Sequence, residues 1–116
     1  MKATLTEEEK LQSNIEKWKK EYPAIYQIDI AGDTFIFRPI NRAEYKFFMK
    51  EASALKDEER QEARITREEE VSKVATLYPE PEELEKIIDG CAGIATALAD
   101  NIMYYSGFAE ESVQKL

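Results

Sequence analysis

Residues 25–39, IYQIDIAGDTFIFRP, decide the fold of this 116-residue chain. Residues 25–30 alternate between apolar and polar side chains, and residues 34–39 place Phe35 and Phe37 on one face. Alternation of this kind predicts strands with one buried face. A glycine that opens a two-residue turn is typical of a type II′ hairpin. The sequence therefore predicts a β-hairpin with its turn at Gly32-Asp33.

This turn predicts a register in which Ile30 faces Phe35 and Ile28 faces Phe37, so the apolar faces of the two strands coincide. A register shifted by one residue would send both phenylalanines to the other face. A lone hairpin is marginally stable in water, so helices must cover the aromatic face. The predicted fold class is α+β, mainly helical, with one N-terminal hairpin packed against four to five helices.

Helical patterns flank the hairpin. A capping box at residues 6–9 begins a helix that extends to about residue 20. Its apolar face carries Leu11, Ile15 and Trp18, and we expect Trp18 to pack as core under the hairpin. A second cap at Asn41 begins another helix. Its apolar face is predicted to comprise Tyr45, Phe48, Met49, Ala52 and Leu55.

The whole chain, residues 1–116, is expected to form a single domain, with the first helix, the hairpin and the second helix within residues 1–55. Residues 56–70 are almost wholly charged, and two interpretations stay open: a solvated helix with a break near Ile65, or a linker. Residues 71–108 predict the C-terminal helices. The first of these carries an apolar stripe from Val71 to Tyr78 and is broken at Pro79. Residues 109–116 are a frayed or disordered tail.

Composition excludes several functional classes. The chain has no histidine and one cysteine, Cys91, so the commonest general base and a thiolate zinc cluster are missing. We expect Cys91 to lie in the core, and we expect neither enzyme activity nor a cofactor nor a metal. The 16 basic and 24 acidic residues give a net charge of −8, which disfavours a nucleic-acid partner. No apolar stretch has the length of a membrane span, so no membrane association is expected.

Binding of another protein remains as the expected kind of function, and large aromatic residues are the candidate contacts. The candidates are Trp18, Phe47, Tyr104, Tyr105 and Phe108. Trp18 and Phe47 have core positions as their alternative, and core is the favoured interpretation for both. The three residues near the C-terminus either contact a partner or form a small terminal cluster, and consecutive tyrosines on a helix must diverge. Whether the chain forms a homo-oligomer is left open.

Residues 35–45, FIFRPINRAEY, resemble the FxFRPLxRxEY stretch of small phage tail assembly proteins, in which it follows a short strand and opens a helix. LYP at residues 77–79, AGI at residues 92–94 and residues 102–108 look similar to the same group. The resemblance implies a tail assembly chaperone of a tailed bacteriophage, acting in the cytoplasm of the bacterial host. Such a protein binds the apolar tape-measure protein during tail assembly and needs no cofactor. The alternatives are a structural subunit of the tail or baseplate, and a regulatory binding module without a phage role.

Overall fold

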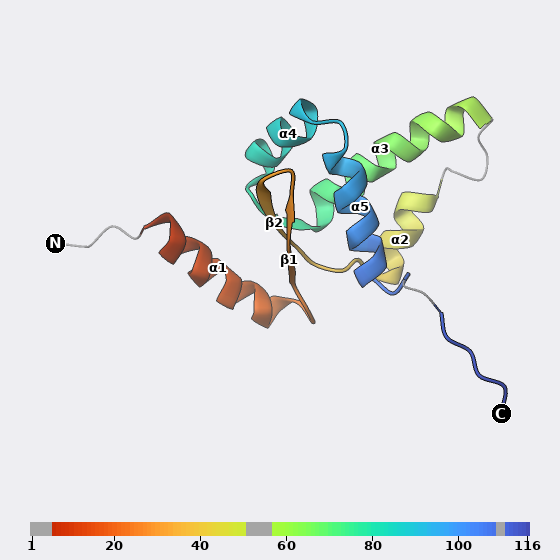
Figure 1. Ribbon diagram of the computed structural model, residues 1–116, viewed down its shortest axis with the longest axis horizontal. Helices are drawn as coiled ribbons and strands as arrows, with labels where there is room; N and C mark the ends of the chain where they lie inside the picture. The colour runs from red at the N-terminus through yellow and green to blue at the C-terminus, as the bar shows by residue number, and fades with distance from the viewer. Residues whose placement is uncertain (1–5, 51–56, 109–110) are drawn as a thin grey trace.

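The computed structural model describes residues 6–50, 57–108 and 111–116 (Figure 1). The elements follow in the order α1 (Glu7–Glu21), β1 (Tyr26–Ile30), β2 (Asp33–Phe37), α2 (Arg42–Met49), α3 (Asp57–Ala75), β3 (Thr76–Tyr78), α4 (Pro81–Gly90) and α5 (Ile94–Tyr105). This is a mainly helical α+β fold, which confirms the predicted fold class. Residues 57–70 are helical because α3 continues without a break through Ile65.

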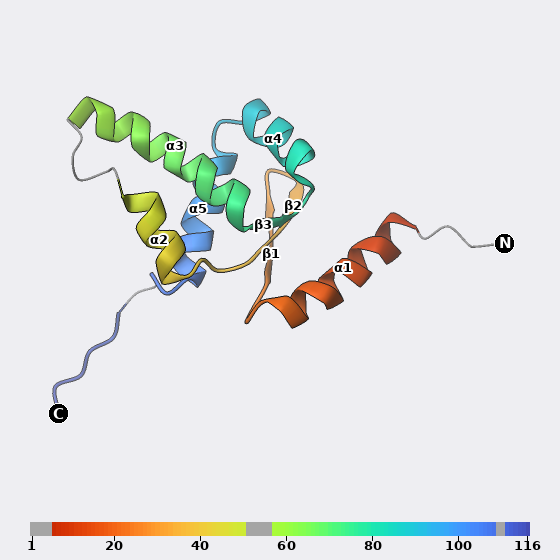
Figure 2. The ribbon, with the colours of Figure 1, turned by 180° about the vertical axis from the view of Figure 1, so that it is seen from behind.

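The three strands form an antiparallel sheet with β2 in the centre. In Figures 1 and 2, α1 lies on one side of this sheet, and α3 and α5 lie on the other. Phe35 and Phe37 point toward α3 and α5 and are completely buried. The main core therefore lies between one face of the sheet and α3, α4 and α5. It comprises Phe35, Phe37, Ile40, Val71, Ala75, Leu84, Ile88, Ile94, Ala95, Leu98, Ala99 and Ile102.

The hairpin turn differs from the prediction. Its two central residues are Ala31 and Gly32, with φ angles of 52° and 86°. Positive φ at both positions is the requirement of a type I′ turn, whose twist matches that of the strands. Ile28 faces Phe35 and Tyr26 faces Phe37, so the predicted register is wrong by two residues.

A shift of two residues leaves every side chain on its predicted face, because side chains alternate with a period of two. The observed register brings the Tyr26 and Phe37 rings to a centroid distance of 5.5 Å. It also lets Thr34 Oγ1 donate a hydrogen bond to Asp29 Oδ1 at 2.7 Å. These contacts across the strands offset the strain of a non-glycine residue with positive φ.

Replacement of Ala31 with glycine should stabilise the protein by about 0.5–1 kcal/mol, because the left-handed conformation costs an alanine about 1–2 kcal/mol and costs glycine almost nothing. Urea denaturation measures this gain. Ala24 precedes β1 and has a negative φ. Ala24→Gly is therefore the matched control, and it should be neutral or destabilising. Equal effects of the two substitutions would contradict the strain at Ala31.

The third strand was not predicted. The sequence pattern assigns Tyr78 to the apolar stripe of a helix, but α3 ends at Ala75 and residues Thr76–Tyr78 pair with β2. The N–H of Arg38 donates a hydrogen bond to the carbonyl of Ala75 at 3.0 Å, next to this pairing. Pairing with β2 is a long-range contact that overrides the local helical pattern, since strand preference depends strongly on the neighbours of a segment.

Two expected core positions are also wrong. Trp18 is half-buried, and α1 contributes no buried residue, because α1 lies on the side of the sheet opposite the aromatic face. Cys91 lies in the turn between α4 and α5 and is exposed. Ala52 and Leu55, which were predicted on the apolar face of the helix after Asn41, lie outside the described residues.

Candidate functional site

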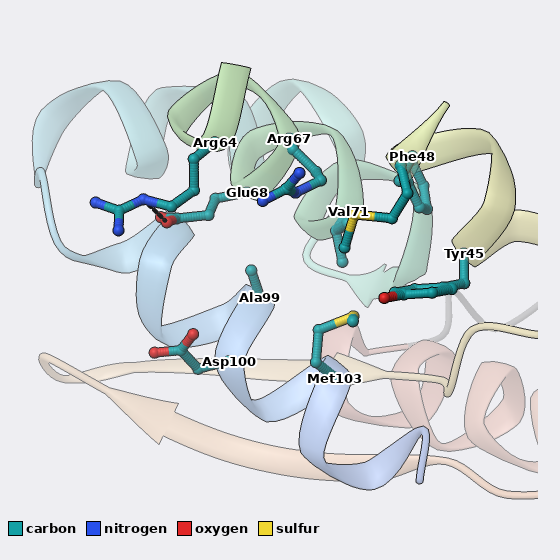
Figure 3. A pocket seen from close by; sticks show the side chains of 10 residues that line it. Tyr45, Phe48, Arg64, Arg67, Glu68, Val71, Ala99, Asp100 and Met103 are labelled. Atoms are coloured by element: carbon teal, nitrogen blue, oxygen red, sulfur yellow. Dashed lines mark ion pairs between the residues drawn. The ribbon is translucent and has the colours of Figure 1, made fainter. Parts of the chain in front are cut away.

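A groove lies between α2, α3 and α5. It encloses a volume of about 180 Å³. Figure 3 shows its side chains converging from the three helices. They are Tyr45, Phe48 and Met49 from α2, Arg64, Arg67, Glu68 and Val71 from α3, and Ala99, Asp100 and Met103 from α5.

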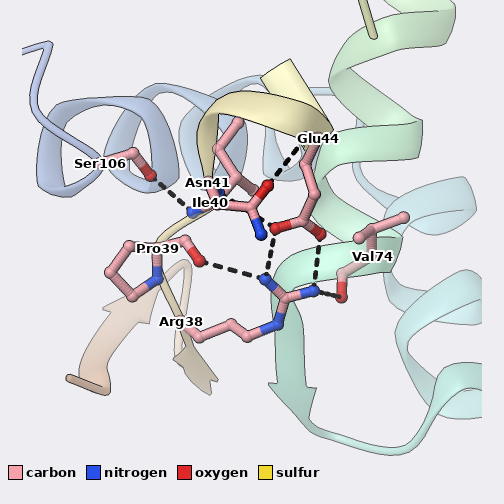
Figure 4. Close-up of polar contacts among 7 residues, drawn as sticks. All are labelled: Arg38, Pro39, Ile40, Asn41, Glu44, Val74 and Ser106. Carbon is pink, nitrogen blue, oxygen red and sulfur yellow. Dashed lines mark hydrogen bonds and ion pairs between the residues drawn. The ribbon is translucent and has the colours of Figure 1, made fainter. Parts of the chain in front are cut away.

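Helix α2 is held beside the groove by Arg38, which follows β2. Its two Nη atoms donate hydrogen bonds to the two carboxylate oxygens of Glu44, each at 2.9 Å (Figure 4). Arg38 also donates to the carbonyls of Pro39 at 3.1 Å and Val74 at 3.5 Å, and it lies over the ring of Tyr22. A single guanidinium therefore joins the ends of α1 and β2 to α2 and α3.

The start of α2 is fixed by a capping box. The N–H of Glu44 donates to Asn41 Oδ1 at 2.9 Å, and the N–H of Asn41 donates to Glu44 Oε1 at 3.1 Å. This arrangement satisfies backbone donors that a helix end leaves without partners. The FRPxxRxEY part of the sequence is thus a structural unit, since Arg38 and Glu44 set the angle at which α2 leaves the sheet.

Hydrogen bonds of two serines connect α5 to the segment before α2 and to α3. Ser106 at the end of α5 accepts a hydrogen bond from the N–H of Ile40 at 2.8 Å. The hydroxyl of Ser72, which is completely buried, lies within hydrogen-bond distance of the carbonyls of Glu68 in α3 (2.7 Å) and Ala95 in α5 (3.1 Å), where α3 packs on α5. Glu68 accepts a hydrogen bond from Thr96 and pairs with Arg64 at 3.7 Å. These contacts hold α3 and α5 at a fixed separation along the groove.

The groove has an apolar floor and a charged rim. Phe48, Val71 and Met103 form the floor, and Met103 can adjust its shape because an unbranched thioether side chain is flexible. Arg67 is half-buried on the rim, and no ion pair joins it to a carboxylate within the described ranges. Asp100 is exposed on the opposite rim. The arrangement suits an apolar side chain flanked by charged or polar groups.

The ion pair of Arg38 and Glu44 predicts acid sensitivity. The hydrogen bonds from Arg38 hold the pKa of Glu44 below its usual value of 4.5. A lowered pKa contributes stability that is present above the pKa of the unfolded chain and is lost as the pH falls through the folded pKa. Urea denaturation from neutral pH down to about pH 3 should show this loss, and Glu44→Gln should remove that part of the pH dependence. An unchanged pH profile in Glu44→Gln would contradict the assignment.

None of the five aromatic candidates lines the groove. Phe47 is 71% exposed and, with Phe48 and Val74, lines a separate hollow between α2 and α3, so the favoured core position is wrong; its role as a partner contact stays a prediction. Tyr104, Tyr105 and Phe108 are about half exposed at the end of α5, where the Tyr105 ring packs at a tilt against Tyr26 and Phe108 contacts Tyr45. The rings pack together as a small terminal cluster and remain about half exposed, and their contact with a partner stays a prediction.

The groove residues themselves were not predicted as a site. The sequence pattern gave Phe48, Met49 and Val71 as apolar helix positions, and it treated Arg64 and Arg67 as part of a charged surface. Only the packing of α3 across α2 and α5 brings them together. Among the described residues, no cluster of acidic or cysteine side chains could hold a metal ion. No described helix combines the length and apolar character needed to cross a bilayer.

Comparisons of the chain with protein-family models, with curated protein sequences and with solved structures found no match.

Proposed function

We propose that this protein is a non-enzymatic tail assembly chaperone of a tailed bacteriophage, whose groove between α2, α3 and α5 holds an amphipathic segment of the tape-measure protein. The observation that carries the proposal is the groove itself, an apolar hollow with a charged rim between three helices. An amphipathic helix binds such a surface by laying its apolar face into the groove.

The size of the groove suits one anchoring side chain. A cavity of about 150 Å³ accommodates a benzene-sized ring, and the volume here is about 180 Å³. A phenylalanine or leucine of the partner would bury its apolar surface against Phe48, Val71 and Met103. Arg67 would then pair with an acidic residue that follows this anchor in the partner, because Arg67 is half-buried beside the floor.

The identity of the partner comes from the resemblance. The residues that resemble tail assembly proteins, 35–45, form the β2–α2 junction that places one wall of the groove. A chaperone for a long apolar protein must itself stay in solution, and a net charge of −8 favours this. The chaperone is therefore expected to act before the tail is complete and to leave the finished particle.

Co-expression tests the function. The tape-measure protein should be recovered in soluble form in larger amount with this protein than without it. Met49→Lys and Arg67→Glu should abolish this gain, because loss of a central interface contact weakens binding by about 2 kcal/mol or more, a factor of about 30. Phe47→Ser is the matched control, since Phe47 is 71% exposed and does not line this groove. Equal soluble yields with wild-type protein and groove variants would contradict the role of the groove.

Mass spectrometry of purified virions separates the chaperone from the alternative of a tail subunit. A chaperone that acts transiently should be absent from the particle. A fixed number of copies in each virion would instead assign the protein to the tail or baseplate structure.

A further inference from the structure

The outer edge of β1 carries backbone groups that point away from the sheet. The pair of residues next to a two-residue turn is hydrogen-bonded, and hydrogen-bonded pairs then alternate along the strands. Ile30, Ile28 and Tyr26 therefore bond to β2, and the N–H and C=O groups of Gln27 and Asp29 point outward. Within the described residues, no backbone hydrogen bond from another segment reaches Gln27 or Asp29. In Figure 1 no helix crosses in front of β1.

We propose that this edge joins two copies of the chain: β1 pairs antiparallel with β1 of a second copy about a two-fold axis, with Gln27 of each copy opposite Asp29 of the other. The two three-stranded sheets then form one continuous sheet. This inference does not depend on which partner the groove between α2, α3 and α5 holds.

The edge is complementary to itself in this register. Gln27 and Asp29 both direct their backbone groups outward, so they can exchange hydrogen bonds across the axis as a hydrogen-bonded pair. Their side chains are exposed on the face of the sheet away from the main core, where an amide can donate to a carboxylate. The alternative with Asp29 opposite Asp29 would place two like charges together, which is destabilising.

The apolar face of the edge is also complementary to itself. The register sets Ile28 opposite Ile28 and Tyr26 opposite Ile30 of the second copy. A hollow of about 140 Å³ opens at this point between β1 and α5. Tyr105 lines it with its ring 4.5 Å from that of Tyr26, and Tyr104 packs against Tyr105 at 5.0 Å. The half-exposed tyrosines beside the edge are the residue type enriched at interfaces.

A second copy is the occupant that this edge fits, because its outward backbone groups, its Gln27–Asp29 pairs and its apolar face are each complementary to themselves.

Analytical ultracentrifugation of the full chain tests the proposal. The mass should rise from 13.4 kDa toward that of a dimer as concentration increases. Gln27→Lys should tighten the dimer and Gln27→Asp should weaken it, each by about fivefold in Kd, because two symmetric cross-strand pairs gain or lose a charge attraction. Gln61→Lys and Gln61→Asp are the matched controls, because they change the net charge by the same amounts at an exposed position on α3. They should change the Kd of the dimer much less than the Gln27 variants do.

A third variant removes the edge itself. Gln27→Pro deletes an outward N–H and leaves the bonds of β1 to β2 intact, and proline is tolerated at such edge positions. It should yield a monomer with the circular dichroism spectrum of the folded chain. A chain that stays at 13.4 kDa up to millimolar concentration overturns the proposal. The same holds if Gln27→Lys and Gln27→Asp shift the dimer in the same direction, or if Gln61 variants reproduce their effects.

Discussion

Replacement of Phe35 with alanine is expected to lower the free energy of unfolding by about 4 kcal/mol, the largest effect of any substitution considered for this chain. Phe35 is completely buried and lies opposite Ile28 in the hairpin, at the centre of the sheet face that α3 and α5 cover. Its removal loses the free energy that burial of the ring away from water provides, and it also leaves a cavity. The total free energy of unfolding of such a domain is about 5–15 kcal/mol, so the variant should be close to unfolding.

Phe47→Ala is the matched control for this prediction. It removes the same ring from a position that is 71% exposed. Surface substitutions usually change stability by no more than about 0.5 kcal/mol. Urea denaturation followed by circular dichroism measures both variants. A large loss of stability in Phe47→Ala would mean that the Phe47 ring is buried, contrary to the structure.

Replacement of Arg38 with alanine is expected to cost about 2–3 kcal/mol, because removal of one partner of a part-buried ion pair leaves the other charge unpaired. The Arg38 side chain is 15% exposed and the Glu44 side chain 22%, so solvent screens this pair only partly. The loss of contacts to Tyr22 and to the carbonyls of Pro39 and Val74 adds to the effect. The same variant should also weaken binding at the groove, since Arg38 sets the position of α2.

A double-mutant cycle separates the ion pair from the other contacts of Arg38. Arg38→Leu with Glu44→Leu should lose less stability than the sum of the two single variants, since the double variant leaves no unpaired charge. Arg42→Ala is the control, because Arg42 is exposed and its guanidinium lies over the ring of Tyr45. Additive effects at Arg38 and Glu44 would show that the two side chains do not act as a unit.

Periodicity predicted the fold class and the two faces of the hairpin, but not the register. The glycine at position 32 suggested a turn in which it comes first, whereas Ala31 takes that place with a positive φ. The conformational preference of alanine disfavours a positive φ at this position. The observed register is favoured by the pairs Tyr26–Phe37 and Asp29–Thr34, and these lie outside the turn. Cross-strand contacts therefore outweighed a strain of about 1–2 kcal/mol.

The groove could be predicted only in part. The apolar stripe of α2 and the position of Val71 followed from helical spacing, and the capping box at Asn41 was evident from the sequence. Helical spacing does not tell which helix covers another. The exposure of Phe47 and the half-burial of Arg67 therefore appear only in the folded chain.

The sequence by itself determined that a hairpin with one aromatic face is present, that capped helices accompany it, and that histidine chemistry is absent. Each of these depends on neighbouring residues or on composition alone. Only the tertiary structure decided that Thr76–Tyr78 forms a strand, that Trp18 lies off the core, and that three helices enclose a groove. These features depend on contacts between segments distant in the sequence, where hydrogen bonding and packing outweigh local preference.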